Sequence, residues 1–305
     1  MSNAELRQRA EALGVQVTYW DWQGRETTVP DETLLAIAVA LEDVTLPDTP
    51  GRPPGKRTAG TQPAVAPVPG QRSWGFTVQL YSLRSRASWG QGDLRDLAEF
   101  AAWAARDLGA GFVLINPLHA AEPLPPVSPS PYLPMSRRWI SPLYLRIEDI
   151  PEFAELNFPE RTRLAALGNP LRAASGTAAL IDRDAVWLAK RTALEIVRKV
   201  PLSPPRQASL DAFRVRNGPA LDDWGTWCAF AEVHGPDYRT WPVPLRDPRS
   251  AETYVLRGDL STRVDFHVWV QWLVAEQTAA AQASARAAGM PIGIVADLAV
   301  GAHPG

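Results

Sequence analysis

The stretch from Gly111 to Ile147 reads GFVLINPLHAAEPLPPVSPSPYLPMSRRWISPLYLRI, and it decides the expected fold. It opens with the apolar run Phe112 to Ile115, which ends abruptly at Asn116-Pro117. A short apolar run of this kind is typical of a β-strand that is buried on both faces of a parallel sheet. The proline-rich loop that follows cannot be helical. Its prolines restrict the backbone around Tyr132 and predict an aromatic ring held in one place.

The neighbouring sequence predicts that this strand belongs to a parallel α/β sheet. Strands are expected near 76–80 and 292–298, and Gly90 to Asp93 punctuates the chain before an amphipathic helix that runs to Leu108. Strand, helix and strand in this order form a right-handed crossover, the unit of doubly wound sheets and (β/α)8 barrels. Asp93 is a good helix N-cap, for which we expect a structural role.

Composition shifts divide the chain into three parts. Residues 1–45 predict a small helical unit, with helices at 2–14 and 30–41 and a strand at 15–20. Residues 46–72 are rich in Pro, Gly, Thr and Ala, which is typical of a flexible linker. Residues 73–305 hold the α/β pattern. Within them, 151–262 reads as a large helical insertion, and Val264 to Ala288 as one long helix.

Composition and charge exclude several classes of protein. A hydrophobic content of 46% with 21% charged residues is that of a soluble globular protein, and a net charge of −2 argues against nucleic acid or an anionic membrane as partner. The single cysteine, Cys228, excludes an internal disulfide and fits a reducing compartment. With a polar N-terminus and no apolar stretch of about 20 residues, the sequence predicts a cytoplasmic location. Its four histidines lack metal-ligand spacing and no phosphate-binding glycine motif is present, so neither metal nor cofactor is expected.

Several motifs follow one another in an order that carries a family resemblance. They are WGFTVQLYSLRSRASWGQGDLRDL from Trp74, Asn-Pro-Leu-His at 116–119, Ser-Pro-Tyr at 130–132, Ser-Arg-Arg-Trp at 136–139, VDFHVWVQWLVAEQ from Val264 and MPIGIVADLAVG from Met290. Together they resemble the amylomaltase (disproportionating enzyme) family of 4-α-glucanotransferases, over its N-terminal portion only. The resemblance implies a (β/α)8 TIM-type barrel that is truncated here after about its third strand. Longer family members carry a β-rich module before the barrel, which is missing from this chain.

The resemblance also implies a set of substrate-binding residues for maltooligosaccharides or other α-1,4-glucans. Tyr132 is expected to stack on a sugar ring, and Asp297 to hydrogen-bond sugar hydroxyls next to the scissile bond. Asn116 and His119 lie at the mouth of the strand that ends at Ile115, where either could touch a sugar. Ser130 is expected to fix the loop through backbone hydrogen bonds. Arg137 and Arg138 are expected to anchor it to backbone carbonyls.

The catalytic carboxylates are not expected within this chain. Retaining cleavage of a glycosidic bond needs two carboxyl groups about 5–5.5 Å apart, which come from strand ends at one face of the barrel. Asp297 is the one acidic residue at a predicted strand end, and the resemblance places the nucleophile and the acid/base on later strands, beyond Gly305. The sequence therefore predicts a 4-α-glucanotransferase fragment that is inactive alone. Two alternatives remain open: a non-catalytic α-glucan-binding protein and a gene fragment without function.

Overall fold

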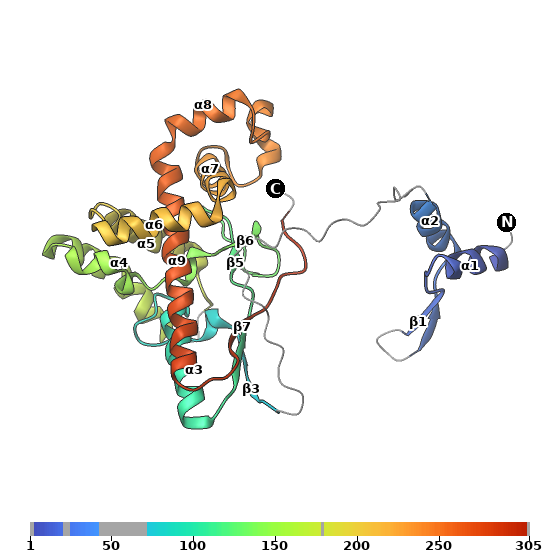
Figure 1. The fold of residues 1–305 in the computed structure, drawn as a ribbon, viewed down its shortest axis with the longest axis horizontal. Coiled ribbons are helices and arrows are strands. Elements are labelled where there is room, and N and C mark those ends of the chain that lie inside the picture. The colour runs from blue at the N-terminus through green and yellow to red at the C-terminus, as the bar shows by residue number, and fades with distance from the viewer. Residues whose placement is uncertain (1–2, 21–24, 43–71, 178–179, 304–305) are drawn as a thin grey trace. The chain divides into compact units, whose positions relative to one another are not determined.

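The computed structural model describes residues 3–20, 25–42, 72–177 and 180–303 (Figure 1). The chain divides into two compact units, Met1–Pro69 and Gly70–Gly305, each of which is described by itself. The predicted linker at 46–72 lies, apart from its last residue, outside the described residues. Among the described residues, no helix has the length and apolar character that crossing a membrane requires.

The first unit contains two helices and a short antiparallel ribbon. Its elements are α1 (Asn3–Ala12), β1 (Thr18–Trp20), β2 (Glu26–Thr28) and α2 (Asp31–Glu42). Both predicted helices are confirmed, whereas β2 was not expected. A small core of Leu6, Ala10 and Leu34 holds the unit together, with Val17 and Val29 packed against it.

The second unit is built on a parallel sheet of three strands. They are β3 (Gly75–Val78), β4 (Phe112–Ile115) and β7 (Gly293–Ala296), in the order β3-β4-β7. The register pairs Phe112 with Gly75 on one side and with Gly293 on the other. Val113 and Ile115 of the central strand are fully buried. The three predicted strands are confirmed, although the outer two are shorter than expected because β3 leads into the 3-10 helix Leu80–Ser82 and β7 ends at Ala296.

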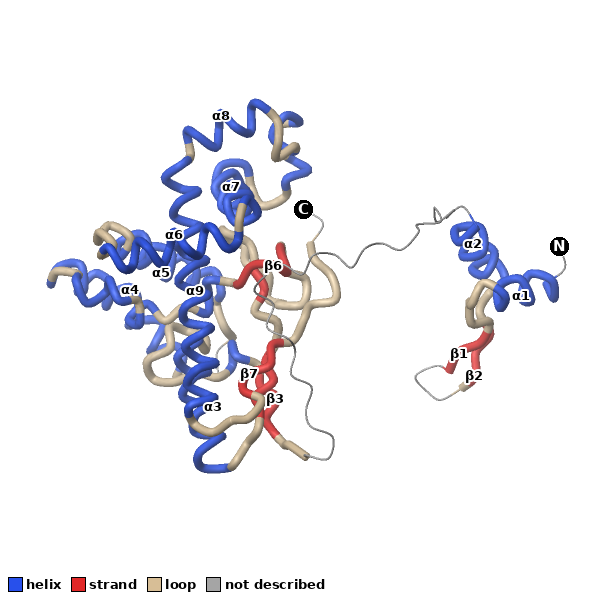
Figure 2. Tube along the Cα trace, in the orientation of Figure 1, coloured by secondary structure: helices blue, strands red, loops and turns tan. Residues whose placement is uncertain are grey.

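Two helices cover this sheet, as Figure 2 shows for α3 and α9. The first is α3 (Leu94–Leu108), which begins at a capping box in which Asp93 accepts hydrogen bonds from the backbone N–H groups of Arg95 and Asp96. The predicted N-cap is thus confirmed, and Gly109 ends the helix with a positive φ of 69°. The second is the predicted long helix α9 (Ser261–Ala287), which packs along both α3 and α7 (Pro219–His234). Its N-terminal half is apolar on several faces because neighbours surround it.

The predicted insertion is helical, and its described residues contain no strand. Its further helices are α4 (Phe158–Ser175), α5 (Arg183–Val197), α6 (Pro204–Asn217) and α8 (Ala251–Asp259). The described residues are therefore α/β but mostly helical, with a small parallel sheet.

An antiparallel pair, β5 (His119–Ala120) and β6 (Ser136–Ile140), was not foreseen by the sequence analysis. It encloses the proline-rich loop between its strands. Two glutamines of α9 hold the backbone at the end of β6 and in the segment after it. The amide of Gln271 both donates to and accepts from the backbone of Ile140, and the amide of Gln277 does the same with Arg146. The apolar run from 143 to 147 forms buried 3-10 turns between these anchors.

Candidate functional site

The carboxyl ends of β4 and β7 meet at one edge of the sheet, where most of the predicted site residues lie. The backbone N–H of Asp297, just past β7, donates to the carbonyl of Ile115 at the end of β4 (2.9 Å). Asn116 to His119 therefore lie beside Asp297. Ligands of open α/β sheets bind outside this edge, since loops there are free to vary while the strands stay fixed.

Asp297 is exposed at this edge. One carboxylate oxygen, Oδ1, accepts a hydrogen bond from the backbone N–H of Leu298 (2.8 Å), which fixes the turn after the strand. A carboxylate has room for about four hydrogen bonds, so this turn leaves acceptor capacity that faces solvent. The geometry suits a group that receives hydrogen bonds from hydroxyls.

His119 holds the chain segment that follows Asp297. Its Nε2 accepts a hydrogen bond from the backbone N–H of Ala299 (3.3 Å), which requires a neutral imidazole with its proton on Nδ1. Burial and the nearby Arg137 guanidinium lower the pKa of His119, while Asp297 acts in the opposite direction. His119 is therefore set to position the Asp297 turn at neutral pH.

Arg137 reinforces the same contact from β6. Its Nη1 donates to the carbonyls of Ala299 (3.2 Å) and Val300 (3.1 Å), as expected of an arginine that anchors backbone. Arg138 behaves differently, since its guanidinium lies over the ring of Trp139, 5.8 Å from the centroid. The expectation for Arg137 is confirmed.

Tyr132 lies exposed in the proline-rich loop, with 46% of its surface accessible. Its backbone N–H donates to Oγ of Ser130 (3.3 Å), so Ser130 forms the local turn that the sequence predicts. The loop is tied to the Asp297 segment because the N–H of His303 donates to the carbonyl of Pro134 (2.7 Å). The structure thus ties both His119 and the loop that carries Tyr132 to the segment that follows Asp297.

Helix α5 braces the first half of this loop. Asp184 accepts a hydrogen bond from the backbone N–H of Val127 (2.7 Å), and the indole of Trp187 donates to the carbonyl of Pro123 (2.8 Å). A rigid loop loses little conformational entropy when a ligand binds. The prolines and these two contacts together pre-organise the position of Tyr132.

Asn116 is buried, with only 2% of its surface accessible, and its amide is used within the protein. Its Oδ1 accepts from the backbone N–H of Leu80 (2.7 Å), while Nδ2 donates to the carbonyl of Pro117 (2.8 Å) and to the hydroxyl of Tyr144 (3.0 Å). These bonds connect the end of β4 to the turn after β3. This geometry favours a positioning role, and contact with a sugar stays a prediction.

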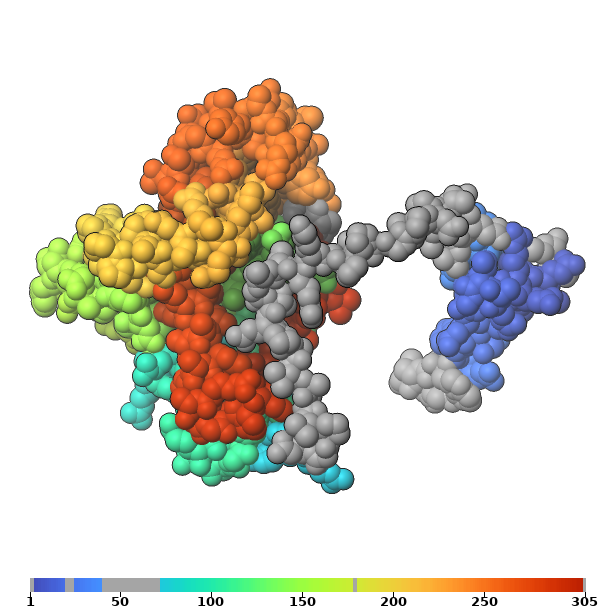
Figure 3. Space-filling view, viewed as in Figure 1, coloured from blue at the N-terminus to red at the C-terminus, as the bar shows by residue number. Residues whose placement is uncertain are grey.

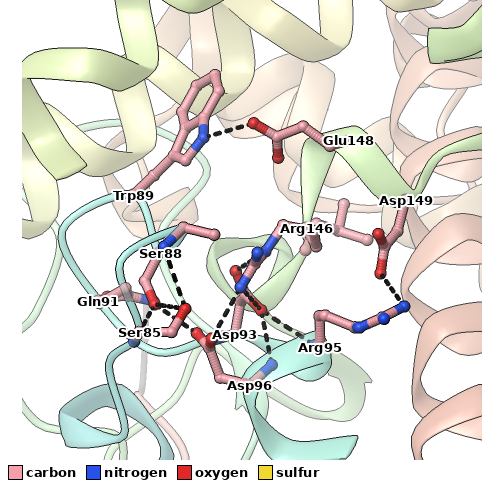
Figure 4. A network of polar contacts seen from close by, with 12 residues as sticks. Ser85, Ser88, Trp89, Gln91, Asp93, Arg95, Asp96, Arg146, Glu148 and Asp149 are labelled. Atoms are coloured by element: carbon pink, nitrogen blue, oxygen red, sulfur yellow. Dashed lines mark hydrogen bonds and ion pairs between the residues drawn. The ribbon is translucent and has the colours of Figure 1, made fainter. Parts of the chain in front are cut away.

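Sequence reasoning missed a buried group of charges behind the edge (Figure 4). The guanidinium of Arg146 donates through Nη2 to Asp93 (3.0 Å) and to Asp96 (2.8 Å). The ammonium of Lys190, on α5, donates to the carbonyls of Leu143 (2.6 Å) and Leu145 (2.8 Å). Burial lowers the pKa of Lys190 to about 8, against the attraction of Asp93. These closed contacts hold the start of α3, the 143–146 turn and α5 together.

The charges do not form a metal site. Among the residues that the structure describes, no group of three or more His, Cys, Asp or Glu side chains is arranged to hold a metal ion. In the sequence Lys190 ends the apolar run from Ala185 to Ala189 but is followed by Arg191, so its burial carries little signal. Nothing in the spacing connects Arg146 to Asp93 either.

Comparison with known proteins places the chain in a family. The family model described as 4-alpha-glucanotransferase matches residues 78–305. A 4-alpha-glucanotransferase of Mycobacterium tuberculosis is 52% identical over 241 residues, which cover 77% of this chain and 33% of that protein. One from Haemophilus influenzae is 32% identical over 264 residues, covering 80% of this chain and 37% of that protein. The chain thus spans about a third of the length of the relatives it matches.

Solved structures agree with this placement. The crystal structure of amylomaltase from Corynebacterium glutamicum superposes with a TM-score of 0.67 at 44% identity, over 76% of this chain and 31% of that one. Amylomaltase from Streptococcus agalactiae in complex with acarbose gives a TM-score of 0.60 at 18% identity, over 75% of this chain and 43% of that one, which shows the fold alone. Since the family model covers most of the chain and the mycobacterial relative is identical at 52% of the aligned residues, this protein belongs to the 4-alpha-glucanotransferase family, glycoside hydrolase family 77.

Proposed function

We propose that this chain supplies the glucan-binding part of a 4-α-glucanotransferase that acts on α-1,4-glucans. The observation that carries the proposal is the sheet edge: Asp297 follows β7, His119 and Arg137 hold the segment after it, and the loop of the exposed Tyr132 is tied to the same segment at Pro134. An aromatic ring packs against the apolar face of a pyranose, and a carboxylate accepts hydrogen bonds from its hydroxyls. The streptococcal amylomaltase, which has the same fold, was solved in complex with acarbose, and this supports a carbohydrate as the class of ligand.

Each site residue then has a role. Tyr132 stacks on a glucose ring beside the scissile bond, and Asp297 hydrogen-bonds the hydroxyls of that sugar. Ser130 fixes the loop, while His119 orients the turn that carries Asp297. Asn116 holds the carboxyl end of β4 in position. No metal or cofactor takes part in this scheme.

The reaction of the whole enzyme is a double displacement with retention. One carboxylate attacks the anomeric carbon and forms a glucosyl ester while an acid protonates the departing sugar oxygen. The group that acted as the acid then acts as a base and removes the proton of an acceptor 4-hydroxyl. That oxygen attacks the ester and releases the nucleophilic carboxylate. Asp297 is the acidic residue that directly follows a strand of the described parallel sheet, and under this proposal it binds sugar rather than attacks it. The nucleophile and the acid/base therefore come from outside residues 1–305, on further strands of a (β/α)8 barrel.

The 305-residue chain alone is expected to release no glucose from maltotriose. Co-expression with the C-terminal remainder of a related enzyme is expected to restore glucose release, because that part brings the two carboxylates. A coupled glucose assay on both preparations measures this. Robust turnover by residues 1–305 alone would contradict the assignment of the carboxylates.

Replacement of Tyr132 by alanine in the complemented enzyme is expected to lower maltotriose turnover about 2- to 10-fold. The reason is the loss of ring stacking worth about 0.5–1.5 kcal/mol. The melting temperature should stay unchanged, since the side chain is half exposed. Tyr132→Phe is the control, because it keeps the ring and should keep most of the activity. Equal turnover in the alanine variant would remove Tyr132 from the site.

A non-catalytic glucan-binding protein is the second candidate. It is favoured by the exposed Tyr132 and Asp297, since Asp297 is, among the described residues, the acidic residue that directly follows a strand of the parallel sheet. Maltooligosaccharide binding without turnover, in both the isolated and the complemented chain, would select it over the transferase.

A further inference from the structure

The helical insertion contains a pocket away from the sheet edge. Helices α7 and α8 and the segment between them enclose a cavity of about 360 Å³. This volume lies within the range of about 300–1,000 Å³ that is usual for small-molecule sites. In Figure 3 this part of the second unit forms an orange lobe beside α6.

Aromatic side chains line the pocket. Trp241 forms its buried wall and packs against Phe230 and Trp227, with ring centroids 5.8 and 6.4 Å apart. Tyr238 and Tyr254 belong to the same lining but are exposed, Tyr254 by 78%. A tyrosine so exposed contributes little to the core, and two of them beside one cavity offer ring faces to a ligand.

Two of the three arginines that line the pocket are paired with carboxylates. Arg249 donates to both oxygens of Asp223 (3.3 and 3.1 Å), and Arg257 lies 3.5 Å from Asp222. Arg246 donates through Nε to the carbonyl of Trp241 (2.8 Å). The two ion pairs offer hydrogen-bond donors and acceptors with little net field, which a neutral polyhydroxylated ligand can use, while Arg246 adds a positive charge that makes an anion the competing ligand to test.

A second, shallower pocket shares lining residues with this one. It is lined by Met135, Ser136, Arg138, Trp139 and Trp224 together with two residues of the pocket itself, Asp223 and Trp227. Its first members lie in or just before β6, directly after the loop of Tyr132. The rings of Trp139, Trp224 and Trp227 form a stacked row, with centroids 6.5 and 5.1 Å apart, that continues to Trp241.

We propose that the pocket of Trp227, Tyr238, Trp241 and Tyr254 is a second site for a neutral α-glucan, with the shallower pocket beside it taking further sugar units. The identity of the sugar rests on the proposed function, whereas the pocket and its chemistry do not. The second site would retain a long glucan on the enzyme while its end lies at the sheet edge. Short oligosaccharides would occupy one site at a time.

The test is titration of the 305-residue chain with maltoheptaose by calorimetry, with tryptophan fluorescence as a second readout. The variants are Tyr132→Ala, the double variant Tyr238→Ala/Tyr254→Ala, and Phe158→Ala as a control for loss of an exposed ring outside the pocket. We expect Tyr132→Ala to retain a binding event that shifts indole emission. The double tyrosine variant should weaken that event about tenfold, and Phe158→Ala should leave it unchanged.

The outcomes separate the two proposals. Binding that Tyr132→Ala abolishes and the double tyrosine variant leaves intact overturns the second site while supporting the sheet edge. Binding that only the double variant weakens supports the pocket and contradicts the role of Tyr132. Inorganic phosphate is the anion probe, and phosphate that binds the pocket where maltoheptaose does not overturns the assignment to a neutral glucan. Absence of maltoheptaose binding to the unaltered chain overturns both.

Discussion

Replacement of Arg146 by methionine is expected to destabilise the second unit by about 3–5 kcal/mol. The guanidinium is buried between Asp93 and Asp96, which are themselves buried, so its removal leaves two carboxylates without their main counter-ion. Burial already raises the pKa of Asp93 even with Arg146 and Lys190 present. A domain has only about 5–15 kcal/mol of stability in total, so this loss is decisive. Urea unfolding followed by tryptophan fluorescence measures it.

Arg95→Met is the matched control. Arg95 lies on α3 next to Asp96 and pairs with Glu99 (2.7 Å), but its side chain is half exposed. Exposed pairs contribute about 0.2–1 kcal/mol, so this variant should unfold close to the unaltered protein. Adding Asp96→Asn to Arg146→Met should recover part of the loss, because one unpaired charge is then removed. A loss below about 1 kcal/mol for Arg146→Met would show that water or rearrangement replaces the ion pair.

Glu232→Gln is expected to cost roughly 3 kcal/mol at pH 7 and much less near pH 2. Glu232, on α7, accepts hydrogen bonds from Arg263 (2.7 Å through Nε) and from His267 (3.2 Å). These two partners lower its pKa from 4.5 to about 2, against the effect of burial. Because the folded-state pKa is depressed, the ionised carboxylate contributes its full stabilisation above the unfolded-state pKa of about 4.3. This contribution is lost as the pH falls toward the folded-state pKa.

His267 makes a second contribution to the pH dependence of stability, at higher pH. Burial lowers the pKa of its imidazole, so the folded state favours the neutral ring and acid favours unfolding below about pH 6.5. Stability of the unaltered chain should therefore fall between pH 6.5 and 2, and Glu232→Gln should flatten the part below about 4.5. Glu195→Gln is the control, since Glu195 contacts the same Arg263 (3.2 Å) from a more exposed position. Parallel pH profiles for the Glu232 and Glu195 variants would refute the assignment.

The parts of the fold that the sequence predicted correctly are those fixed by local rules. Phe112 to Ile115 formed the central strand, as a run this apolar predicts, but only Val113 and Ile115 on one face are fully buried, whereas Phe112 and Leu114 on the other are partly exposed. Asp93 capped α3 because a carboxylate before an apolar helix satisfies free N–H groups. Ser130 formed its turn for the same reason, as its hydroxyl bonds the backbone two residues away.

The parts that escaped prediction depend on contacts between distant residues. β6 reads Ser-Arg-Arg-Trp-Ile, which shows no alternation of apolar and polar residues, and its partner β5 has only two residues. Asn116 looked available at a strand end, yet Tyr144 and the turn after β3 reach it through the fold. Trp139, Trp224, Trp227 and Trp241 come from separate segments, and only the packing of β6 against α7 turns them into one row.

The pairing of β4 with β7 joins two strands that the ribosome makes at widely separated times. Phe112 and Gly293 are partners in the strand register, and the entire helical insertion is synthesised between them. At about 5–20 residues per second, a ribosome needs roughly 10–35 s to pass from one strand to the other. During that interval the nascent sheet has two strands, and one side of β4 waits without a partner. Such a chain depends on early folding of its helices, or on a chaperone, to shield that strand until β7 emerges.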